Sequence, residues 1–309
     1  ILALLRYTKT FVNFVSELSE QFPTMLKAIA AIGRLSIVLN MDAELDNGEI
    51  TITNGKIVKD DKISSFQGNV KFENVYFGYE DNENVLKNIS FTVDNGQKIA
   101  FVGSAGAGKT TITNLLMRFY DIKSGSITVD GVEINNIRKK DLRKLTSVVL
   151  QDVHMFNGSI IDNLKYGKLD IDDEEVIRIS ELTKIDRFVK HLKEGYMTNL
   201  KSDAGNLSQG ERQLLAITRA VIADRPILIF DEATSSVDTR TEKLINDVLD
   251  TLFMDKLVFV IAHRLSTIRN ADKIVVLENG EIVEFGNHEE LLRNRDRYYQ
   301  LCCGKAELE

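Results

Sequence analysis

An apolar strand that runs into a glycine-rich loop and then into a helix places the strongest constraint on the fold of this chain. The short apolar run Ile99–Val102 is followed at once by Gly103–Thr110, which has the spacing Gly-x-x-x-x-Gly-Lys-Thr. Apolar side chains then recur at helical spacing from Ile112 to Phe119. A glycine loop in this position turns successive backbone amides toward a phosphate group. The pattern therefore predicts an α/β domain with a phosphate-binding loop.

Further strand patterns occur on both sides of this loop. Val148–Leu150, Ile227–Phe230 and Leu257–Ala262 are continuous apolar runs, typical of parallel strands buried on both faces. Asp130-Gly131 and Asn279-Gly280 are typical of hairpin turns, with Ile127 to Ile134 forming the first hairpin. Strands that alternate with helices predict a mixed, mainly parallel sheet with antiparallel pieces beside it.

The remaining segments complete the predicted organisation. Val70 and Phe72, and then residues 89–93, indicate strands of an antiparallel β subdomain. Residues from about Ile160 to Glu194 carry helical periods and many charges, which predicts an inserted α-helical subdomain over about 152–222. A final helix is expected from His288, and residues 305–309 form a C-terminal tail.

The N-terminal segment differs from the rest of the chain. Residues 1–40 carry one apolar stripe at three-to-four spacing, which predicts a long amphipathic helix with a kink at Pro23. The polar composition of residues 41–68 predicts a linker, and no motif in it indicates a function. Within it, Ile50 to Ile57 fits a small hairpin around Asn54-Gly55 and fits a plain loop equally well.

Composition limits the class of protein. With 309 residues, 43% of them hydrophobic and 28% charged, the chain can bury a full core. A net charge of −7 without a dense Lys/Arg cluster argues against a nucleic-acid partner. The two cysteines, Cys302 and Cys303, are adjacent, which excludes a disulfide framework and favours a reducing cytoplasmic setting. Because no uninterrupted run of 18 apolar residues and no signal-peptide pattern occur, we expect no membrane span within this chain.

Four polar residues are expected at the carboxyl ends of strands, where open α/β sheets bind ligands. Asp231 follows Phe230 and is expected to hold Mg²⁺ through water, and Glu232 is expected to polarise the attacking water. His263 follows Ala262 and is placed to contact a γ-phosphate, whereas a structural role is the alternative. Gln151 ends the strand Val148–Leu150, where its amide is suited to Mg²⁺ or the attacking water. In the loop itself, Lys109 supplies charge to the terminal phosphates and Thr110 a hydroxyl to Mg²⁺.

A helix start predicted at Ser208 adds a second phosphate-binding element. Ser208 precedes Glu211 by three residues, the spacing of a capping box, and an apolar helical pattern follows. Free amides around Gly210 and the positive end of the helix dipole suit a phosphate oxygen. An ordinary capped surface helix is the alternative.

Taken together, these motifs resemble the nucleotide-binding domain of the ATP-binding cassette (ABC) family, in order and spacing, throughout residues 69–304. The resemblance implies ATP and Mg²⁺ as ligands and Tyr79 as the ring that stacks on adenine, with a turn residue as the alternative. It implies ATP contacts from the loop residues Gly103, Ser104, Ala105, Gly106, Ala107, Gly108, Lys109, Thr110 and Thr111. It also implies that a partner chain's ATP is contacted by Leu207, Ser208, Gln209, Gly210, Glu211 and Asp238. The ATPase would thus work as a dimer.

Three departures from the family pattern stand out. Gln209 and Glu211 replace the commoner Gly and Gln of this helix start. Ser202 occupies the place where exporters of the family usually carry a glutamate, so contact with the membrane part is expected to differ in detail. The linker at 41–68 is more polar and varied than expected.

The N-terminal helix favours the exporter subclass, of multidrug, lipid or peptide type. Residues 1–40 resemble the cytoplasmic end of the last transmembrane helix in exporters whose membrane and ATPase parts share one chain. The resemblance implies about six membrane spans upstream of Ile1 and a location on the cytoplasmic face of the membrane. A soluble non-transport ABC ATPase and a regulatory cassette that holds ATP without turnover are the alternatives. A kinase or GTPase would leave Leu207–Glu211 unexplained.

Overall fold

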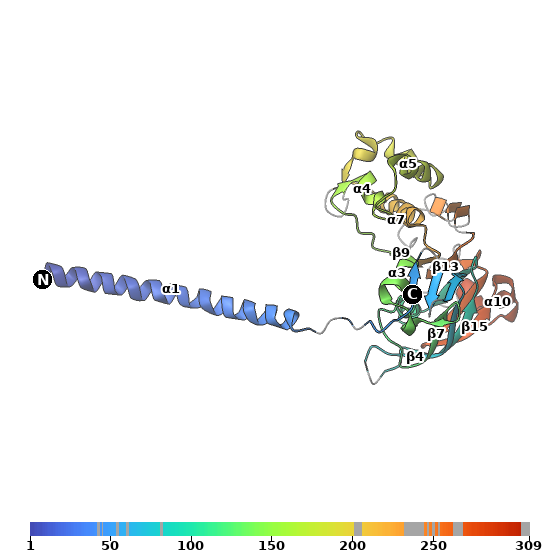
Figure 1. The fold of residues 1–309 in the computed structure, drawn as a ribbon, viewed down its shortest axis with the longest axis horizontal. Helices are drawn as coiled ribbons and strands as arrows, with labels where there is room; N and C mark the ends of the chain where they lie inside the picture. Colours follow the sequence, from blue (N-terminus) through green and yellow to red (C-terminus); the bar gives the residue numbers. More distant parts are fainter. Residues whose placement is uncertain are drawn as a thin grey trace. The chain divides into compact units, whose positions relative to one another are not determined.

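The computed structural model divides into two compact units, Ile1–Asp46 and Asn47–Glu309. It describes residues 1–41, 44, 46–53, 56–59, 62–80, 83–200, 206–231, 244–245, 247–248, 251–252, 254–261 and 268–303. The first unit consists mainly of helix α1, Leu2–Leu39, which continues without a break through Pro23 (Figure 1). None of its side chains is buried.

Helix α1 is long and apolar enough to cross a membrane, and within the described residues it alone meets that criterion. The grounds are length and composition, which core helices of soluble proteins also satisfy. The expectation of no membrane span within the chain rested on the lack of an uninterrupted apolar run. An apolar window with few charged residues is sufficient for a candidate span, so the lack of an uninterrupted run does not decide the matter.

A six-stranded sheet forms the centre of the second unit. Its strand order is β15-β14-β6-β13-β12-β9, and every neighbouring pair is parallel except β14 and β15. This confirms the predicted mixed, mainly parallel sheet. The strands are β6 (Lys98–Gly103), β9 (Thr146–Val149), β12 (Ile227–Asp231), β13 (Leu257–Ile261), β14 (Lys273–Glu278) and β15 (Glu281–Gly286).

Alternate side chains of this sheet contribute to two separate cores. Phe101 and Phe259 stack on one face, with ring centroids 5.9 Å apart, in the core that also holds helix α2, Lys109–Leu116. Val102 and Phe230 belong to the core on the other face. Burial on both faces explains why these strands are continuous apolar runs, since neither face meets water. Phe119 was expected on helix α2 but lies beyond its end and is exposed.

An antiparallel sheet of order β5-β4-β7-β8 covers the core that holds α2. Its strands are β4 (Val70–Phe77), β5 (Leu86–Val93), β7 (Ser124–Val129) and β8 (Val132–Glu133). Asp130 and Gly131 form the predicted hairpin turn with φ angles of 52° and 74°. Ile134 lies not in the hairpin but in the 3₁₀ turn η1 (Ile134–Asn136). The short charged helix α3 (Lys139–Lys144) follows, and its six residues are too few to show a helical period.

The helical subdomain is grouped apart from the antiparallel sheet (Figure 1). Its helices pack mainly through α4 and α5 against α7, and their apolar side chains join the core on the second face of the large sheet. Its elements are β10 (Gly158–Ser159), α4 (Ile160–Lys165), α5 (Asp173–Leu182), α6 (Asp186–Val189), η2 (Gly195–Met197), β11 (Asn199–Leu200) and α7 (Gln209–Ala223). Helices α10 (His288–Asn294) and α11 (Arg297–Cys302) close the domain, as predicted for the segment from His288.

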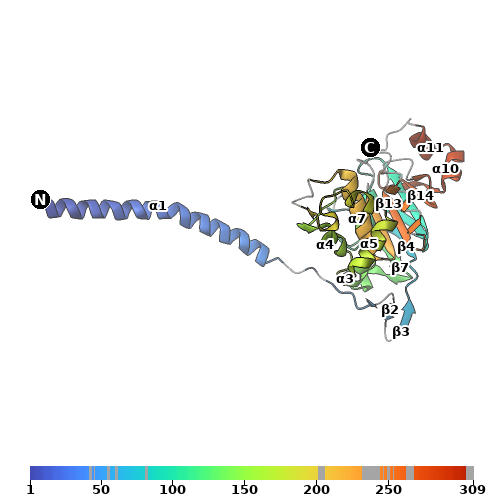
Figure 2. The ribbon, with the colours of Figure 1, turned by 90° about the horizontal axis from the view of Figure 1, so that it is seen from above.

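The segment predicted as a linker is partly folded. Strand β1 (Thr51–Thr53) pairs with β2 (Lys56–Lys59) in the antiparallel register of the hairpin alternative, and β3 (Lys62–Ser65) extends it (Figure 2). Ile50, Ile52 and Ile57 are buried and join the core that holds α2. The apolar side chains of this polar segment therefore anchor it to the domain.

Asp130 holds the end of this segment through its side chain. Its carboxylate accepts hydrogen bonds from the backbone amides of Gln67 (2.7 Å), Gly68 (3.1 Å) and Asn69 (2.8 Å). One carboxylate thus satisfies three amides that lead into β4, while the same residue makes the β7–β8 turn.

We expect Asp130→Ala to lower the free energy of unfolding by about 2 to 3 kcal/mol, because it removes charge-assisted hydrogen bonds to part-buried amides. Urea unfolding followed by circular dichroism measures this. Asp170→Ala, at an exposed aspartate, is the matched control and should stay within about 0.5 kcal/mol of the unsubstituted chain. Equal midpoints for the two variants would show that the Asp130 contacts contribute little.

Candidate nucleotide site

The parallel register brings three of the predicted site elements to one edge of the sheet. Ile261 of β13 pairs with Phe101 of β6 on one side and with Asp231 of β12 on the other. In turn, Phe230 pairs with Val149 of β9. The phosphate loop, Asp231 and the residues after Val149 therefore all leave the sheet at its carboxyl edge, where open α/β sheets bind ligands.

The phosphate loop depends on glycines at positions where no side chain fits. A Cβ atom on Gly103 would lie 2.1 Å from the carbonyl oxygen of Leu277, and one on Gly108 would lie 2.4 Å from Leu86 Cδ2. Both glycines also have positive φ, 149° and 101°. Gly106 has a φ of 77° and faces open space, so its backbone is accessible to a ligand. The loop is thus pressed against the domain on one side and open on the other.

Lys109, the first residue of α2, is folded over this loop. Its side chain is largely buried, and its Nζ donates to the carbonyl oxygens of Gly103 (2.7 Å) and Ser104 (2.9 Å). A buried ammonium requires such acceptors, and phosphate oxygens at the open side are stronger ones. Thr110 is exposed beside it, whereas Thr111 is buried.

Tyr79 is joined to the phosphate-loop helix from the antiparallel sheet. Its hydroxyl is 3.1 Å from Thr111 Oγ1, so the two share a hydrogen bond. Its ring is held edge-on by Phe77 and Tyr120, each with a centroid 5.0 Å away. Half of Tyr79 nevertheless remains exposed, at 51%. A half-exposed aromatic ring is thereby held beside the first turn of the phosphate-loop helix, and Tyr120 is a supporting residue that the sequence alone did not indicate.

Gln151 is exposed and lines a cavity of about 240 Å³. The cavity also includes Gln209 and Arg212 from the first turns of α7. On the same helix, the buried Gln213 donates to the carbonyl oxygen of Leu150 at 3.4 Å. The segment that follows β9 and the start of α7 are therefore neighbours within one chain.

Two residues that sequence reasoning missed shape the segment after Gln151. Asn163 accepts from the amide of Phe156 (2.8 Å) and donates to its carbonyl (2.9 Å). Arg219 donates to the carbonyls of Asn163 (2.9 Å) and His154 (3.4 Å). Burial lowers the pKa of Arg219, but an arginine starts so high that it remains charged. Neither residue belongs to a motif, so only their burial reveals them.

The helix start at Ser208 has the predicted capping box. Ser208 Oγ accepts from the Glu211 amide at 3.3 Å, and the Glu211 carboxylate accepts from both the amide and the hydroxyl of Ser208 at 2.8 Å. The carboxylate at position 211, a departure from the family pattern, thus folds back onto the cap. There it is stabilised by the positive end of the helix dipole. Gly210 is half-buried in the first turn.

The residues present fit a nucleotide-bound Mg²⁺. Asp231 is half-buried at the end of β12, and two strand spacings, roughly 10 Å, separate its strand from β6. Mg²⁺ keeps several waters and takes only one or two carboxylates besides phosphate oxygens. The described part of the chain holds no cluster of three or more His, Cys, Asp or Glu side chains that could hold a metal ion. Ser202, Glu232, Asp238 and His263 lie outside the described residues.

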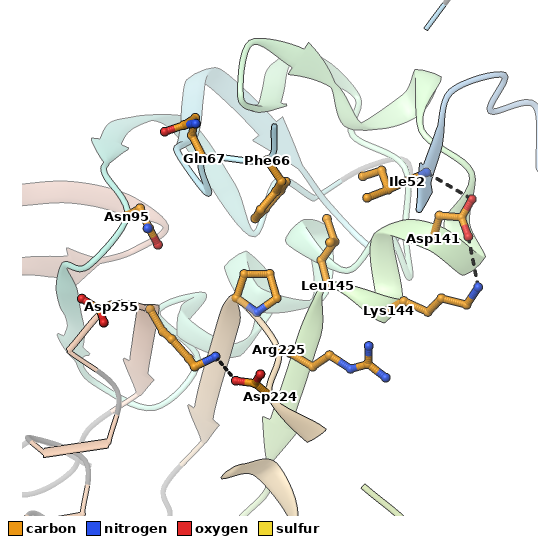
Figure 3. A pocket seen from close by; sticks show the side chains of 12 residues that line it. Ile52, Phe66, Gln67, Asn95, Asp141, Lys144, Leu145, Asp224, Arg225 and Asp255 are labelled. Carbon is orange, nitrogen blue, oxygen red and sulfur yellow. Dashed lines mark hydrogen bonds and ion pairs between the residues drawn. The ribbon is translucent and has the colours of Figure 1, made fainter. Parts of the chain in front are cut away.

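A larger cavity, of about 520 Å³, lies away from this edge (Figure 3). It is lined by residues that precede β9, β12 and β13, including Leu145 and Lys256, and by Ile52 and Phe66 of the linker segment. It contains none of the predicted site residues. The candidate nucleotide site is therefore the carboxyl edge of the sheet.

Known proteins share both the motifs and the fold. Residues 86–235 match the family model described as ABC transporter. An uncharacterized ABC transporter ATP-binding protein, YfiC of Bacillus subtilis, is 42% identical over 97% of this chain and 48% of its own length. The ATP-dependent lipid A-core flippase of Haemophilus influenzae is 41% identical over 97% of this chain and 49% of its own.

Similarity to a solved structure points the same way. A bacterial Atm1-family ABC exporter with ATP bound superposes with a TM-score of 0.79 at 34% identity, over 92% of this chain and 48% of that one. The chain spans about half the length of the curated relatives it matches. With the motif order, the sheet topology and these similarities in agreement, the chain belongs to the ABC transporter family, through its nucleotide-binding domain.

Proposed function

We propose that this chain is the ATPase part of an ABC exporter, which binds and hydrolyses ATP with Mg²⁺ at a dimer interface and so drives transport across a membrane. The observation that carries the proposal is the shared carboxyl edge of β6, β12 and β9, which holds the phosphate loop, Asp231 and Gln151. The similarity to exporters and flippases supports the transport role.

In this proposal each residue has one task. Lys109 would turn from the loop carbonyls to the terminal phosphates, and Glu232 would orient the attacking water. Thr110 would bind Mg²⁺, and Asp231 would hold it through water. His263 contacts the γ-phosphate, and Gln151 reaches Mg²⁺ or the water. When bound, Mg²⁺ neutralises charge on the phosphates.

The second half of the site is proposed to come from a partner chain. Ser208 and Gly210 at the start of α7, with Asp238, would contact the nucleotide held by the partner's phosphate loop. Amides at a helix start suit this task because they bind anions without a side chain. One chain would then contribute to two active sites, which requires a dimer.

The domain organisation is part of the proposal. Residues 1–40 would be the cytoplasmic end of the last transmembrane helix, 41–68 the linker, 69–304 the nucleotide-binding domain and 305–309 a tail. Helix α1, with its exposed apolar side chains, supports a role at the membrane and disfavours the soluble non-transport ATPase. A regulatory cassette without turnover is the other alternative, and a glutamate directly after Asp231 in the sequence disfavours it.

We expect Lys109→Ala to weaken ATP binding by about 2 to 3 kcal/mol, roughly 30- to 150-fold, because it removes a charge-assisted contact to phosphate. Isothermal titration calorimetry with Mg²⁺ and a non-hydrolysable ATP analogue measures the affinity. Lys193→Ala, at an exposed lysine of the helical subdomain, is the control and should bind normally. Equal affinities in both variants would remove Lys109 from the site.

Tyr79 is expected to act through its ring rather than its hydroxyl. Tyr79→Ala should weaken ATP binding by about tenfold, within the 1 to 3 kcal/mol that base stacking on an aromatic ring contributes. Tyr79→Phe loses only the hydrogen bond to Thr111 and should stay within about threefold of the unsubstituted chain. The same calorimetric titration measures the affinity of both variants. Equal losses of ATP affinity in Tyr79→Ala and Tyr79→Phe would contradict stacking of the ring on adenine.

Glu232→Gln should bind ATP normally and accumulate as a dimer, because the neutral amide cannot polarise the attacking water and hydrolysis no longer separates the subunits. Gel filtration coupled to light scattering, with and without Mg²⁺ and ATP, measures the mass. Adding Ser208→Ala to this variant should reduce the dimer fraction. A persistent monomer with ATP bound would count against the dimer interface, and undiminished turnover by Glu232→Gln would count against the catalytic role.

A further inference from the structure

An arginine occupies a backbone position that normally requires glycine, at the end of the phosphate-loop helix. Helix α2 ends in a Schellman motif, in which the Arg118 amide donates to Leu115 O (2.9 Å) and the Phe119 amide to Asn114 O (3.0 Å). Arg118 is the left-handed residue of this motif, with a φ of 52°. A side chain there costs about 1 kcal/mol relative to glycine. The contacts of the arginine side chain must therefore compensate for that strain.

Those contacts lead away from the helix. The Arg118 side chain is only 6% exposed, although it carries a full charge. Its Nε lies 3.4 Å from an Asp121 carboxylate oxygen, and its Nη1 donates a hydrogen bond to the carbonyl oxygen of Ile137 at 3.0 Å. Burial of a guanidinium is costly unless its donors are satisfied, so the Ile137 carbonyl is a significant partner.

A second arginine, on α3, also connects the end of α2 to the segment that contains Ile137. Arg143 of α3 donates to the carbonyls of Met117 (3.3 Å) and Arg118 (3.1 Å), and its guanidinium lies over the Phe119 ring at 4.9 Å. A cation over the last carbonyls of a helix is favoured by the helix dipole. The end of α2 is therefore held to the segment 134–144 by two arginines.

The linker binds to that same segment through its backbone. Ile50 forms a parallel bridge with Ile137, in which the Ile50 amide donates to Asn136 O (2.9 Å) and the Arg138 amide to Ile50 O (3.0 Å). Gly48 permits this approach, because a Cβ on it would lie 2.4 Å from the carbonyl carbon of Ile137.

Two residues further along, the Ile52 amide donates to the Asp141 carboxylate at 3.4 Å (Figure 3). The docked part of the linker is thus residues 48–52, whose contacts to the segment 136–141 come in addition to the pairing of Thr51 and Ile52 with β2.

We propose that Arg118 is a positioning residue that couples nucleotide binding at the phosphate loop to docking of linker residues 48–52. Helix α2 begins at Lys109 and ends two residues before Arg118, and its eight residues span only about 12 Å. A ligand that holds its first turn therefore restrains its last turn, the Ile137 peptide and the linker bridge. The linker is the segment that joins α1 to the domain, so this coupling would carry the state of the ATP site toward the membrane part. The inference rests on the proposed binding of ATP.

Hydrogen exchange of the Ile50 and Arg138 amides tests the coupling in the full chain, since both amides belong to the bridge. Addition of Mg²⁺ and a non-hydrolysable ATP analogue should slow their exchange by about fivefold or more, at the lower end of usual coupling between sites. Calorimetry on the same samples reports whether the nucleotide has bound.

Arg118→Gly is the decisive variant, because glycine suits the left-handed position and relieves its strain while the guanidinium is lost. This variant should still bind nucleotide, but nucleotide should then slow the exchange of the Ile50 and Arg138 amides by no more than about twofold. Arg118→Lys keeps a donor for the Ile137 carbonyl and should restore part of the effect. Arg178→Ala, which removes an exposed arginine bonded to Glu175 in the helical subdomain, should behave like the unsubstituted chain.

Reciprocity provides a second measurement. Gly48→Ala pushes the linker from the Ile137 backbone and should lower nucleotide affinity by the same factor by which nucleotide slows exchange. Nucleotide binding with unchanged exchange of both amides would overturn the coupling and leave the ATPase proposal standing. If nucleotide slowed the exchange of both amides equally in Arg118→Gly and in the unsubstituted chain, the proposed role of the arginine would be overturned. Absence of nucleotide binding to the unsubstituted chain would overturn both proposals.

Discussion

The parallel pairing of β6, β13, β12 and β9 is the constraint on which the rest of the structure depends. Because these strands are buried on both faces, their apolar runs and their register are tightly specified, and a slip by one residue would exchange the two cores. The same register fixes where the strands end. Polar residues that follow them, such as Asp231 and Gln151, are thereby delivered to the edge that holds the phosphate loop.

The phosphate loop contains backbone conformations that are unfavourable for residues other than glycine, and contacts with neighbouring residues hold the loop in place. Gly103 and Gly108 take positive φ angles, and neighbouring atoms leave no room for a Cβ, so both positions require glycine for two separate reasons. Lys109 is held over the loop by two carbonyls, which keeps its charge near the place of a phosphate. Such preorganisation lowers the cost of arranging these groups when a ligand binds.

The linker is more closely integrated than its composition suggests. Its buried isoleucines, including Ile50 and Ile52, pack into the core that holds α2, and Asp130 anchors its end. Arg118 and Arg143 connect this anchored segment to the phosphate-loop helix. This segment is thus attached to the far end of the helix that begins at the phosphate loop.

The sequence by itself determined the main sheet, the phosphate loop, the Asp130-Gly131 turn and the capping box at Ser208, because these features follow from local periodicity, glycine spacing and short-range hydrogen bonds. It left the linker open between hairpin and loop, and it missed α3, whose six residues show no helical period. Only the tertiary structure decided the roles of Arg118 and Arg219. Both guanidinium groups donate to backbone carbonyls of residues that are distant in the sequence, so no local pattern indicates these hydrogen bonds. The hydrogen bonds are important for stability because a guanidinium that is removed from water needs acceptors.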